Sequence, residues 1–102
     1  MAESVPSSTV RVTVRYFAAA RAAAGVTEET VPVAAVPAAA GKPFAVTDVG
    51  TVIMELAARH GDALARVLAR SSYLLDETAV HGPRTPVQAH QVLDVLPPFA
   101  GG

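Results

Sequence analysis

The sequence of 102 residues predicts one α+β domain, in which a mixed sheet packs against one main helix. Residues Val10–Tyr16 alternate between apolar and polar side chains, as in a strand with one buried face. Residues 51–61 carry apolar side chains at helical spacing, and Val92–Leu96 has the composition of a strand. The predicted order of strand, strand, helix, short strands and strand is typical of α+β folds.

The N-terminal third is predicted to form a strand, a short helix and a second strand. After the strand Val10–Tyr16, residues Phe17–Ala24 are mostly strong helix formers, and Gly25 is a residue that commonly ends helices. Glu28–Val33 has strand composition, although Pro32 would confine it to a sheet edge because proline has no N–H to donate. We expect these two strands to pair as in a hairpin.

The middle of the chain is predicted to hold a surface loop followed by the main helix. Residues Ala34–Pro43 are mainly Ala, Pro and Gly and follow neither a helical nor a strand period. Thr51 is expected to be the helix N-cap, and His60 and Gly61 the helix end. The apolar face of this helix consists of Val52, Ile53, Leu56 and Ala57. Another helical turn or two is expected around Leu64, Val67 and Leu68.

The C-terminal third is predicted to be mostly strand. Tyr73–Leu75 and Thr78–Val80 are short strand candidates, His81–Pro83 is a predicted turn, and Val92–Leu96 is the final strand.

Two strand faces are candidate interfaces. Asp94 should point away from the core with Val92 and Leu96, and this outer face would combine a charge with exposed apolar groups. The polar residues of the first strand alternate on one face and could meet an acidic partner, although a solvated face is the simpler interpretation. These residues are Arg11, Thr13 and Arg15.

Composition and charge argue against several classes of protein. The chain is 51% hydrophobic with a mean hydropathy of +0.36, yet it has no apolar run as long as the roughly 18 residues of a membrane span. A formal net charge of −1 leaves no basic surplus for nucleic acid. The lack of cysteine excludes disulfides and thiolate chemistry and agrees with a cytoplasmic location. Residues 1–8 are expected to be a disordered lead and not a signal peptide.

Catalytic and metal motifs are absent from the sequence. The three histidines, His60, His81 and His90, are too dispersed for a recognisable metal site. No Ser-His-Asp order, glycine-rich phosphate loop or paired-carboxylate motif is present. We therefore expect the chain to catalyse nothing by itself.

The C-terminal residues form the most distinctive motif. Pro97 and Pro98 fix φ and cannot donate to a sheet, so the last strand should stop near Leu96 and an extended tail should follow. The tail finishes with Gly101 and Gly102, which have no Cβ and can thread a narrow channel. The six residues after Leu96 could reach roughly 20 Å, far enough to enter the active site of another protein.

Three stretches together resemble the ubiquitin-like sulfur carriers, and most of all the small subunits of molybdopterin synthase. They are residues 12–21 (VTVRYFAAAR), the helix start Thr51-Val52 and residues 95–102 (VLPPFAGG). The similarity extends over most of the chain from Val10 onward, and the tail is its specific part. It implies a β-grasp, or ubiquitin-like, fold over residues 9–96 and an extended tail over 97–102.

The resemblance also implies a role in molybdenum cofactor biosynthesis. In the family, a ubiquitin-activating-like adenylyltransferase uses ATP and Mg to adenylate the terminal glycine, and a persulfide sulfurtransferase provides the sulfur of a thiocarboxylate. Gly102 would be this site, and Gly101 would help the tail to thread the active-site channel of the molybdopterin synthase large subunit. The expected partner-binding residues are Leu96, Pro97, Pro98, Phe99 and Ala100.

On this interpretation the sulfur goes to a cyclic pyranopterin monophosphate in the large subunit, within a heterotetramer of two plus two chains. The small subunit would bind no cofactor, metal, nucleic acid or membrane itself. Alternatives are a sulfur carrier for thiamine thiazole or cysteine, a protein modifier, or a non-catalytic β-grasp interaction module. The single lysine, Lys42, argues against ubiquitin-style chains.

The sequence departs from the family pattern in three places. His90-Gln91 replaces a usual Gly-Asp pair before the last strand, His81-Gly82 replaces an Asn-Gly turn, and the stretch after the second strand is longer. These differences concern turn geometry and register, and they leave the tail motif unchanged.

Overall fold

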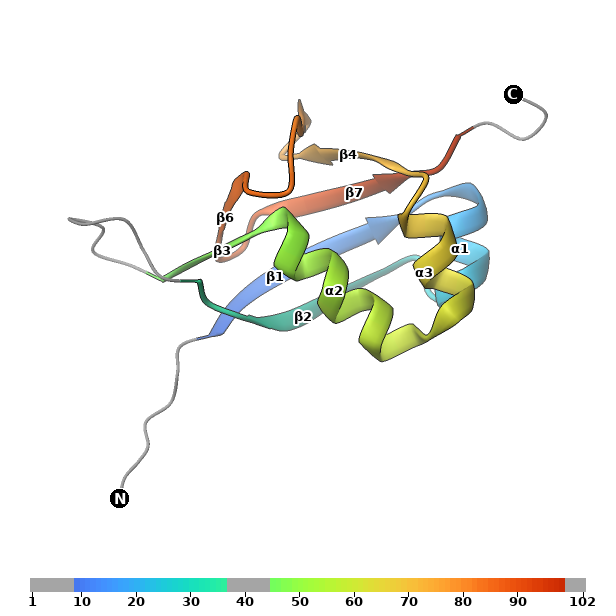
Figure 1. The fold of residues 1–102 in the computed structure, drawn as a ribbon, viewed down its shortest axis with the longest axis horizontal. Coiled ribbons are helices and arrows are strands. Elements are labelled where there is room, and N and C mark those ends of the chain that lie inside the picture. Colours follow the sequence, from blue (N-terminus) through green and yellow to red (C-terminus); the bar gives the residue numbers. More distant parts are fainter. Residues whose placement is uncertain (1–8, 37–44, 99–102) are drawn as a thin grey trace, which may run out of the picture.

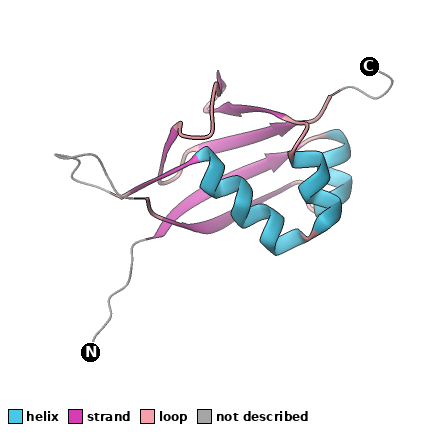
Figure 2. Ribbon diagram, in the orientation of Figure 1, coloured by secondary structure: helices cyan, strands magenta, loops and turns pink. Residues whose placement is uncertain are grey.

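The computed structural model describes residues 9–36 and 45–98. Predictions for residues 1–8, for most of the Ala34–Pro43 loop and for Phe99–Gly102 therefore lie outside the described residues. The described residues form a five-stranded sheet, a two-stranded sheet and three helices. Figure 1 shows how these elements are arranged. In Figure 2 the helices lie together on one side of the larger sheet.

The bounds of the elements follow the chain. They are β1 (Thr9–Tyr16), α1 (Ala18–Ala24), β2 (Glu28–Ala34), β3 (Val46–Asp48), α2 (Val49–His60), α3 (Asp62–Leu68), β4 (Ser72–Leu75), β5 (Thr78–Ala79), β6 (Pro86–Gln88) and β7 (Val92–Leu96).

The larger sheet has the order β2-β1-β7-β4-β5. Its central strands β1 and β7 are parallel, with Val14 opposite Leu93, and the other pairs are antiparallel. The predicted mixed sheet is thus confirmed. Parallel pairing of the first and last strands requires the intervening chain to cross over, and the helices make this crossover on one face of the sheet.

The alternation of β1 sets the two faces of the sheet. Val10, Val12, Val14 and Tyr16 are at most 1% exposed and belong to the core. Leu93 and Val95 of β7 lie in the same core and are fully buried. The α2 residues Val49, Val52 and Leu56 cover this face.

The predicted elements of the N-terminal third are confirmed. Helix α1 follows Phe17 and ends at Gly25, which has the left-handed φ of +80° that glycine adopts without steric cost. Strand β2 pairs antiparallel with β1 and is an edge strand, the position that Pro32 predicts.

The predicted N-cap of the main helix is wrong by three residues. Helix α2 begins at Val49, and its cap is Asp48, whose Oδ1 accepts hydrogen bonds from the Thr51 backbone N–H at 2.8 Å and the Thr51 hydroxyl at 2.6 Å. Asp and Thr are both good N-caps, so composition did not distinguish them. The structure places Thr51 inside the first turn.

The extra helical turns form a separate helix, α3, because Gly61 takes φ +89° and breaks the chain direction after α2. The sequence prediction missed β3 and β6, which pair Thr47 with Val87. Each has only three residues, too few to show a period of two.

Candidate partner interface and tail base

The predicted tail begins at the centre of the sheet. Strand β7 ends at Leu96, as predicted, and Leu96 lies opposite Ser72 of β4. Pro97 is partly buried and Pro98 is exposed. The other predicted site residues, Phe99, Ala100, Gly101 and Gly102, lie outside the described residues. The structure therefore places the base of the tail, and the roles of the tail residues stay predictions.

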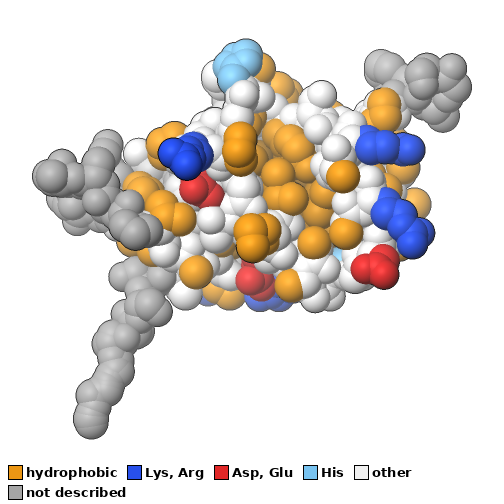
Figure 3. Space-filling view, viewed as in Figure 1, with side chains coloured by type: hydrophobic (Ala, Val, Ile, Leu, Met, Phe, Trp, Pro, Cys, Tyr) orange, Lys and Arg blue, Asp and Glu red, His pale blue; other side chains and the backbone are white. Residues whose placement is uncertain are grey.

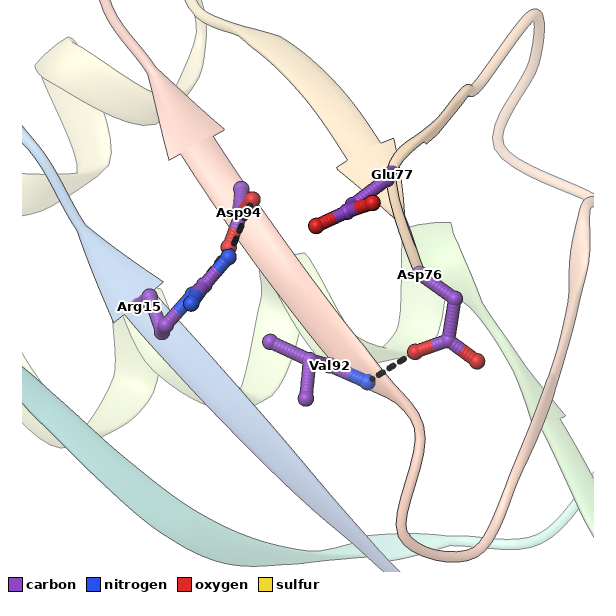
Figure 4. Close-up of a pocket in the computed structure, with 5 residues that line it drawn as sticks. All are labelled: Arg15, Asp76, Glu77, Val92 and Asp94. Atoms are coloured by element: carbon purple, nitrogen blue, oxygen red, sulfur yellow. Dashed lines mark hydrogen bonds and ion pairs between the residues drawn. The ribbon is translucent and has the colours of Figure 1, made fainter.

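An ion pair occupies the outer face of the sheet, the face away from the helices. The Arg15 Nε and Nη2 atoms donate to Asp94 Oδ1 at 2.7 Å and Oδ2 at 2.9 Å, a two-point contact between neighbouring strands. Figure 4 shows the two side chains pointing toward one another, from β1 and β7. Asp94 thus points away from the core, as predicted.

The outer face does not expose Asp94, and its neighbours Val92 and Leu96, expected to be exposed, are partly buried. Asp94 is only 5% exposed, because Arg15 and the neighbouring strands cover it. The hydrogen bond with Asp94 raises the pKa of Arg15, and the negative charge of Asp94 raises it further. Arg15, predicted to meet an acidic partner or to be solvated, pairs with an acid of its own chain.

A turn of two acidic residues borders this ion pair. Asp76 and Glu77 join β4 to β5 with φ of +47° and +70°. The Asp76 carboxylate accepts a hydrogen bond from the Val92 N–H at 2.9 Å and one from the Gln91 side-chain amide at 3.0 Å. Both hydrogen bonds lower the pKa of Asp76, and the one from the Val92 N–H has the larger effect. The turn is thereby tied to the start of β7.

A polar depression of about 310 Å³ lies between the ion pair and the turn, and its lining consists of Arg15, Asp76, Glu77, Val92 and Asp94. Sequence reasoning missed Asp76 and Glu77 as part of this surface. The sequence nevertheless indicates a turn here, because only two residues separate the two short strand candidates and the first of them is Asp, as is typical of tight hairpins.

Apolar side chains lie beside the ion pair. Phe17, immediately after β1, is 39% exposed, and the Arg15 guanidinium carbon lies 6.0 Å from the centre of its ring. Leu74 lies opposite Asp94 and is partly buried, as is Leu96. The tail base therefore adjoins a surface with a fixed ion pair, one exposed aromatic side chain and two partly buried leucines, a combination common in protein interfaces. Phe17 was not predicted as part of it.

The remaining candidate residues are dispersed. Thr13 contacts Thr30 through their hydroxyls at 3.1 Å, and Arg11 is exposed. His60 hydrogen-bonds Glu29 at 2.5 Å, whereas His81 and His90 are exposed. In residues 9–36 and 45–98, no cluster of three His, Cys, Asp or Glu side chains is suited to bind a metal ion. No helix in the same ranges is long and apolar enough to cross a membrane.

Comparison with known proteins finds similarity in structure. No family model and no curated protein matches the chain. A molybdopterin converting factor subunit 1 from Pyrococcus furiosus is 24% identical with a TM-score of 0.64, over 88% of this chain and 99% of that one. Small archaeal modifier protein 1 from Methanosarcina acetivorans is 21% identical with a TM-score of 0.70, over 92% and 98%. Its counterpart from Haloferax volcanii is 22% identical with a TM-score of 0.69, over 90% and 99%.

These similarities cover nearly the whole length of each chain. At this level of identity they establish the fold. The expected likeness to ubiquitin-like proteins is confirmed at the level of the fold. The chain therefore has the ubiquitin-like β-grasp fold, shared with a molybdopterin converting factor subunit and with small archaeal modifier proteins.

Proposed function

We propose that the chain is a sulfur carrier of molybdenum cofactor biosynthesis, acting in the cytoplasm as the non-catalytic small subunit of molybdopterin synthase. The observation that carries this proposal is the sequence of residues 96–102, LPPFAGG, directly after the central strand of a β-grasp fold. The similarity to a molybdopterin converting factor subunit supports it.

The proposed chemistry takes place at Gly102. A C-terminal carboxylate is ionised at neutral pH and is a poor electrophile, so it must first be activated. In an adenylyltransferase with ATP and Mg, a Gly102 carboxylate oxygen attacks the α-phosphorus, and pyrophosphate leaves. The terminal sulfur of a persulfide donor then attacks the acyl carbon and displaces AMP. A thiol reductant cleaves the resulting sulfur–sulfur bond, and the thiocarboxylate remains on Gly102.

The large subunit would supply the substrate site and the acid–base groups. There the thiocarboxylate sulfur attacks a carbon of cyclic pyranopterin monophosphate and displaces an oxygen substituent, so that a carbon–sulfur bond forms as a carbon–oxygen bond breaks. Water then hydrolyses the acyl–sulfur bond. This hydrolysis restores the Gly102 carboxylate and leaves the sulfur on the product. Leu96, Pro97, Pro98, Phe99 and Ala100 would direct the tail into the active site.

The outer face of the sheet would be the docking surface for these partners. Phe17 and Leu96 offer apolar area, and burial of one such side chain contributes about 1.5 to 3 kcal/mol. The Arg15–Asp94 pair is already formed in the free chain. A partner therefore does not need to order these two side chains, which lowers the entropic cost of binding.

The direct test is the intact mass of the chain after incubation with its adenylyltransferase, ATP, Mg, a persulfide sulfurtransferase and a thiol reductant. We expect the mass to change by the replacement of one oxygen with sulfur, and this change to require ATP. A chain lacking Gly101 and Gly102 is the matched control and should not change. Unaltered mass of the full chain with active enzymes would refute the proposal.

A protein modifier is the second candidate, because two of the similar structures are small archaeal modifier proteins. Both functions need adenylation at Gly102, so the product distinguishes them. A modifier forms an amide bond between Gly102 and lysine side chains of other proteins, which mass spectrometry of a tagged chain from cells would detect. A molybdopterin sulfur carrier instead restores cofactor formation to extract that lacks its small subunit. Restored thiazole or cysteine synthesis would indicate another sulfur pathway.

A further inference from the structure

Three arginines lie on the helical side of the molecule, near the base of the tail. Arg21 is in the last turn of α1, Arg66 is in the last turn of α3, and Arg70 follows α3. All three are exposed. Arg70 comes two residues before Ser72, which pairs with Leu96 at the end of β7. In Figure 3, Lys and Arg side chains gather over the end of the molecule where α1 and α3 lie.

These three arginines have no ion-pair partner among the described residues. The arginine ion pairs in residues 9–36 and 45–98 are Arg15–Asp94 and Arg59–Glu55. Asp62 lies one turn before Arg66 but does not pair with it. The helix dipole favours a basic residue in the last turn of a helix, which accounts for Arg21 and Arg66. It does not account for Arg70, which lies beyond α3.

The surface between α1 and α3 is hollowed and partly apolar. A depression of about 520 Å³ is lined by Ala19, Ala22, Ala23, Ala63, Arg66, Val67 and Arg70. The small side chains leave room for the backbone of another chain, and the two guanidinium groups border the same space. Each guanidinium can bind a carboxylate through two parallel hydrogen bonds. The chemistry complementary to this surface is a protein segment rich in Asp and Glu.

We propose that this α1–α3 arginine surface, made of Arg66, Arg70 and the depression between the helices, docks an acidic segment of the adenylyltransferase that receives the tail. The surface lies on the side of the sheet opposite the Arg15–Asp94 pair, so it is a second contact area. A partner bound there also lies beside the end of β7, from which the tail extends. The inference rests on the proposed function only for the identity of that partner.

The binding test uses a hexaglutamate peptide as the probe and amide NMR spectra of the full-length chain at low ionic strength. We expect shift changes in α1, α3 and residues 69–71, and their loss in the double variant Arg66→Glu/Arg70→Glu. The matched control, Arg11→Glu/Arg84→Glu, has the same change of net charge on other exposed positions and should behave like the parent chain. Equal loss in both variants, or no shift in the parent chain, would overturn the inference. Shifts with anionic lipid vesicles and none with hexaglutamate would also overturn it.

The partner test measures adenylation kinetics with the adenylyltransferase. We expect Arg66→Glu/Arg70→Glu to raise KM for the chain about tenfold with kcat unchanged, and added salt to reduce the difference. Unchanged KM in this variant would overturn the proposed docking to this enzyme. If the parent chain is not adenylated but binds hexaglutamate on α1 and α3, the proposed function fails and the acidic docking surface stands.

Discussion

At the scale of single residues, Glu29 connects three elements. Its Oε2 accepts a hydrogen bond from the Tyr16 hydroxyl at 2.6 Å and contacts His60 Nε2 at 2.5 Å. The Tyr16 and His60 rings also meet edge to face, with centres 6.0 Å apart. Burial raises the pKa of Glu29, but the hydrogen bonds with Tyr16 and His60 and the nearby charges of His60 and Arg59 lower it more. The folded state therefore favours ionised Glu29.

This lowered pKa predicts a loss of stability in acid. The contribution of ionised Glu29 is complete above its unfolded pKa of about 4.3, and it disappears as the pH falls through the lower folded pKa. Glu29→Gln should reduce the free energy of unfolding by about 1 kcal/mol at pH 7 and flatten its fall below about pH 5. Urea unfolding from pH 3 to 7 measures both effects.

Glu55→Gln is the control for Glu29. Glu55 pairs with Arg59 one turn away on α2, at 2.8 Å in a largely exposed position. Such pairs contribute about 0.3 to 0.5 kcal/mol, so this variant should lose less than Glu29→Gln. Equal losses of unfolding free energy in the two variants would show that the hydrogen bonds of Glu29 stabilise the fold no more than an exposed ion pair does.

The turn between β4 and β5 contains backbone strain at Glu77. Its φ of +70° is in the left-handed region, which costs a non-glycine residue about 1 to 2 kcal/mol. We expect Glu77→Gly to raise the free energy of unfolding by up to about 1 kcal/mol, because relief of this strain exceeds the entropy that glycine adds to the unfolded chain. Thermal unfolding measures the change. Ala79→Gly, in the adjacent strand, should instead destabilise, and stabilisation by both would contradict the explanation.

At the scale of elements, Pro32 protects the free edge of β2. Opposite residues of β1 and β2 alternate between hydrogen-bonded and non-hydrogen-bonded pairs. The Tyr16 N–H donates to the Thr27 carbonyl at 2.8 Å, so Val14 and Glu29, two residues further along each strand, also form a hydrogen-bonded pair. Arg11 and Pro32 form a non-hydrogen-bonded pair, and their backbone N and C=O groups point away from each other. The Arg11 carbonyl accordingly accepts from His90 at 2.8 Å, and Pro32 presents no N–H at the open edge.

We expect Pro32→Thr to increase self-association, because it restores an N–H at an unpaired edge. The measurement is light scattering or size-exclusion chromatography over a range of protein concentrations. Thr30→Val is the control, since it adds an apolar β-branched residue on the same strand without adding a donor. Association that rises with Thr30→Val and not with Pro32→Thr would attribute the effect to hydrophobicity and not to the edge.

At the scale of the whole molecule, we expect the fold and the tail to contribute separately to stability and to function. The described core runs from Val10 to Val95 and ends before the tail. We therefore expect Gly102→Ala to leave the melting temperature unchanged and to block thiocarboxylate formation, because a methyl group at the reacting end crowds a narrow channel. Both quantities are measured on the same preparation. A parallel fall in stability and yield would contradict this separation.

The sequence predicted the elements better than the site. The strand alternation of β1, the end of α1 at Gly25 and the edge position of β2 follow from residues that act locally. The N-cap was misplaced because Asp48 and Thr51 satisfy the same local rule. Strands β3 and β6 were missed because a three-residue strand depends on its partner, which lies about forty residues away in the chain.

The sequence by itself determined the α+β class, the faces of β1 and the place where the last strand gives way to prolines. These properties depend on side chains within a few positions of each other, where spacing and stereochemistry act directly. Only the tertiary structure decided that Arg15 pairs with Asp94, 79 residues away, and that Arg66 and Arg70 border one hollow with the alanines of α1. Such contacts depend on strand register and helix packing, which the cooperative burial of the whole core sets.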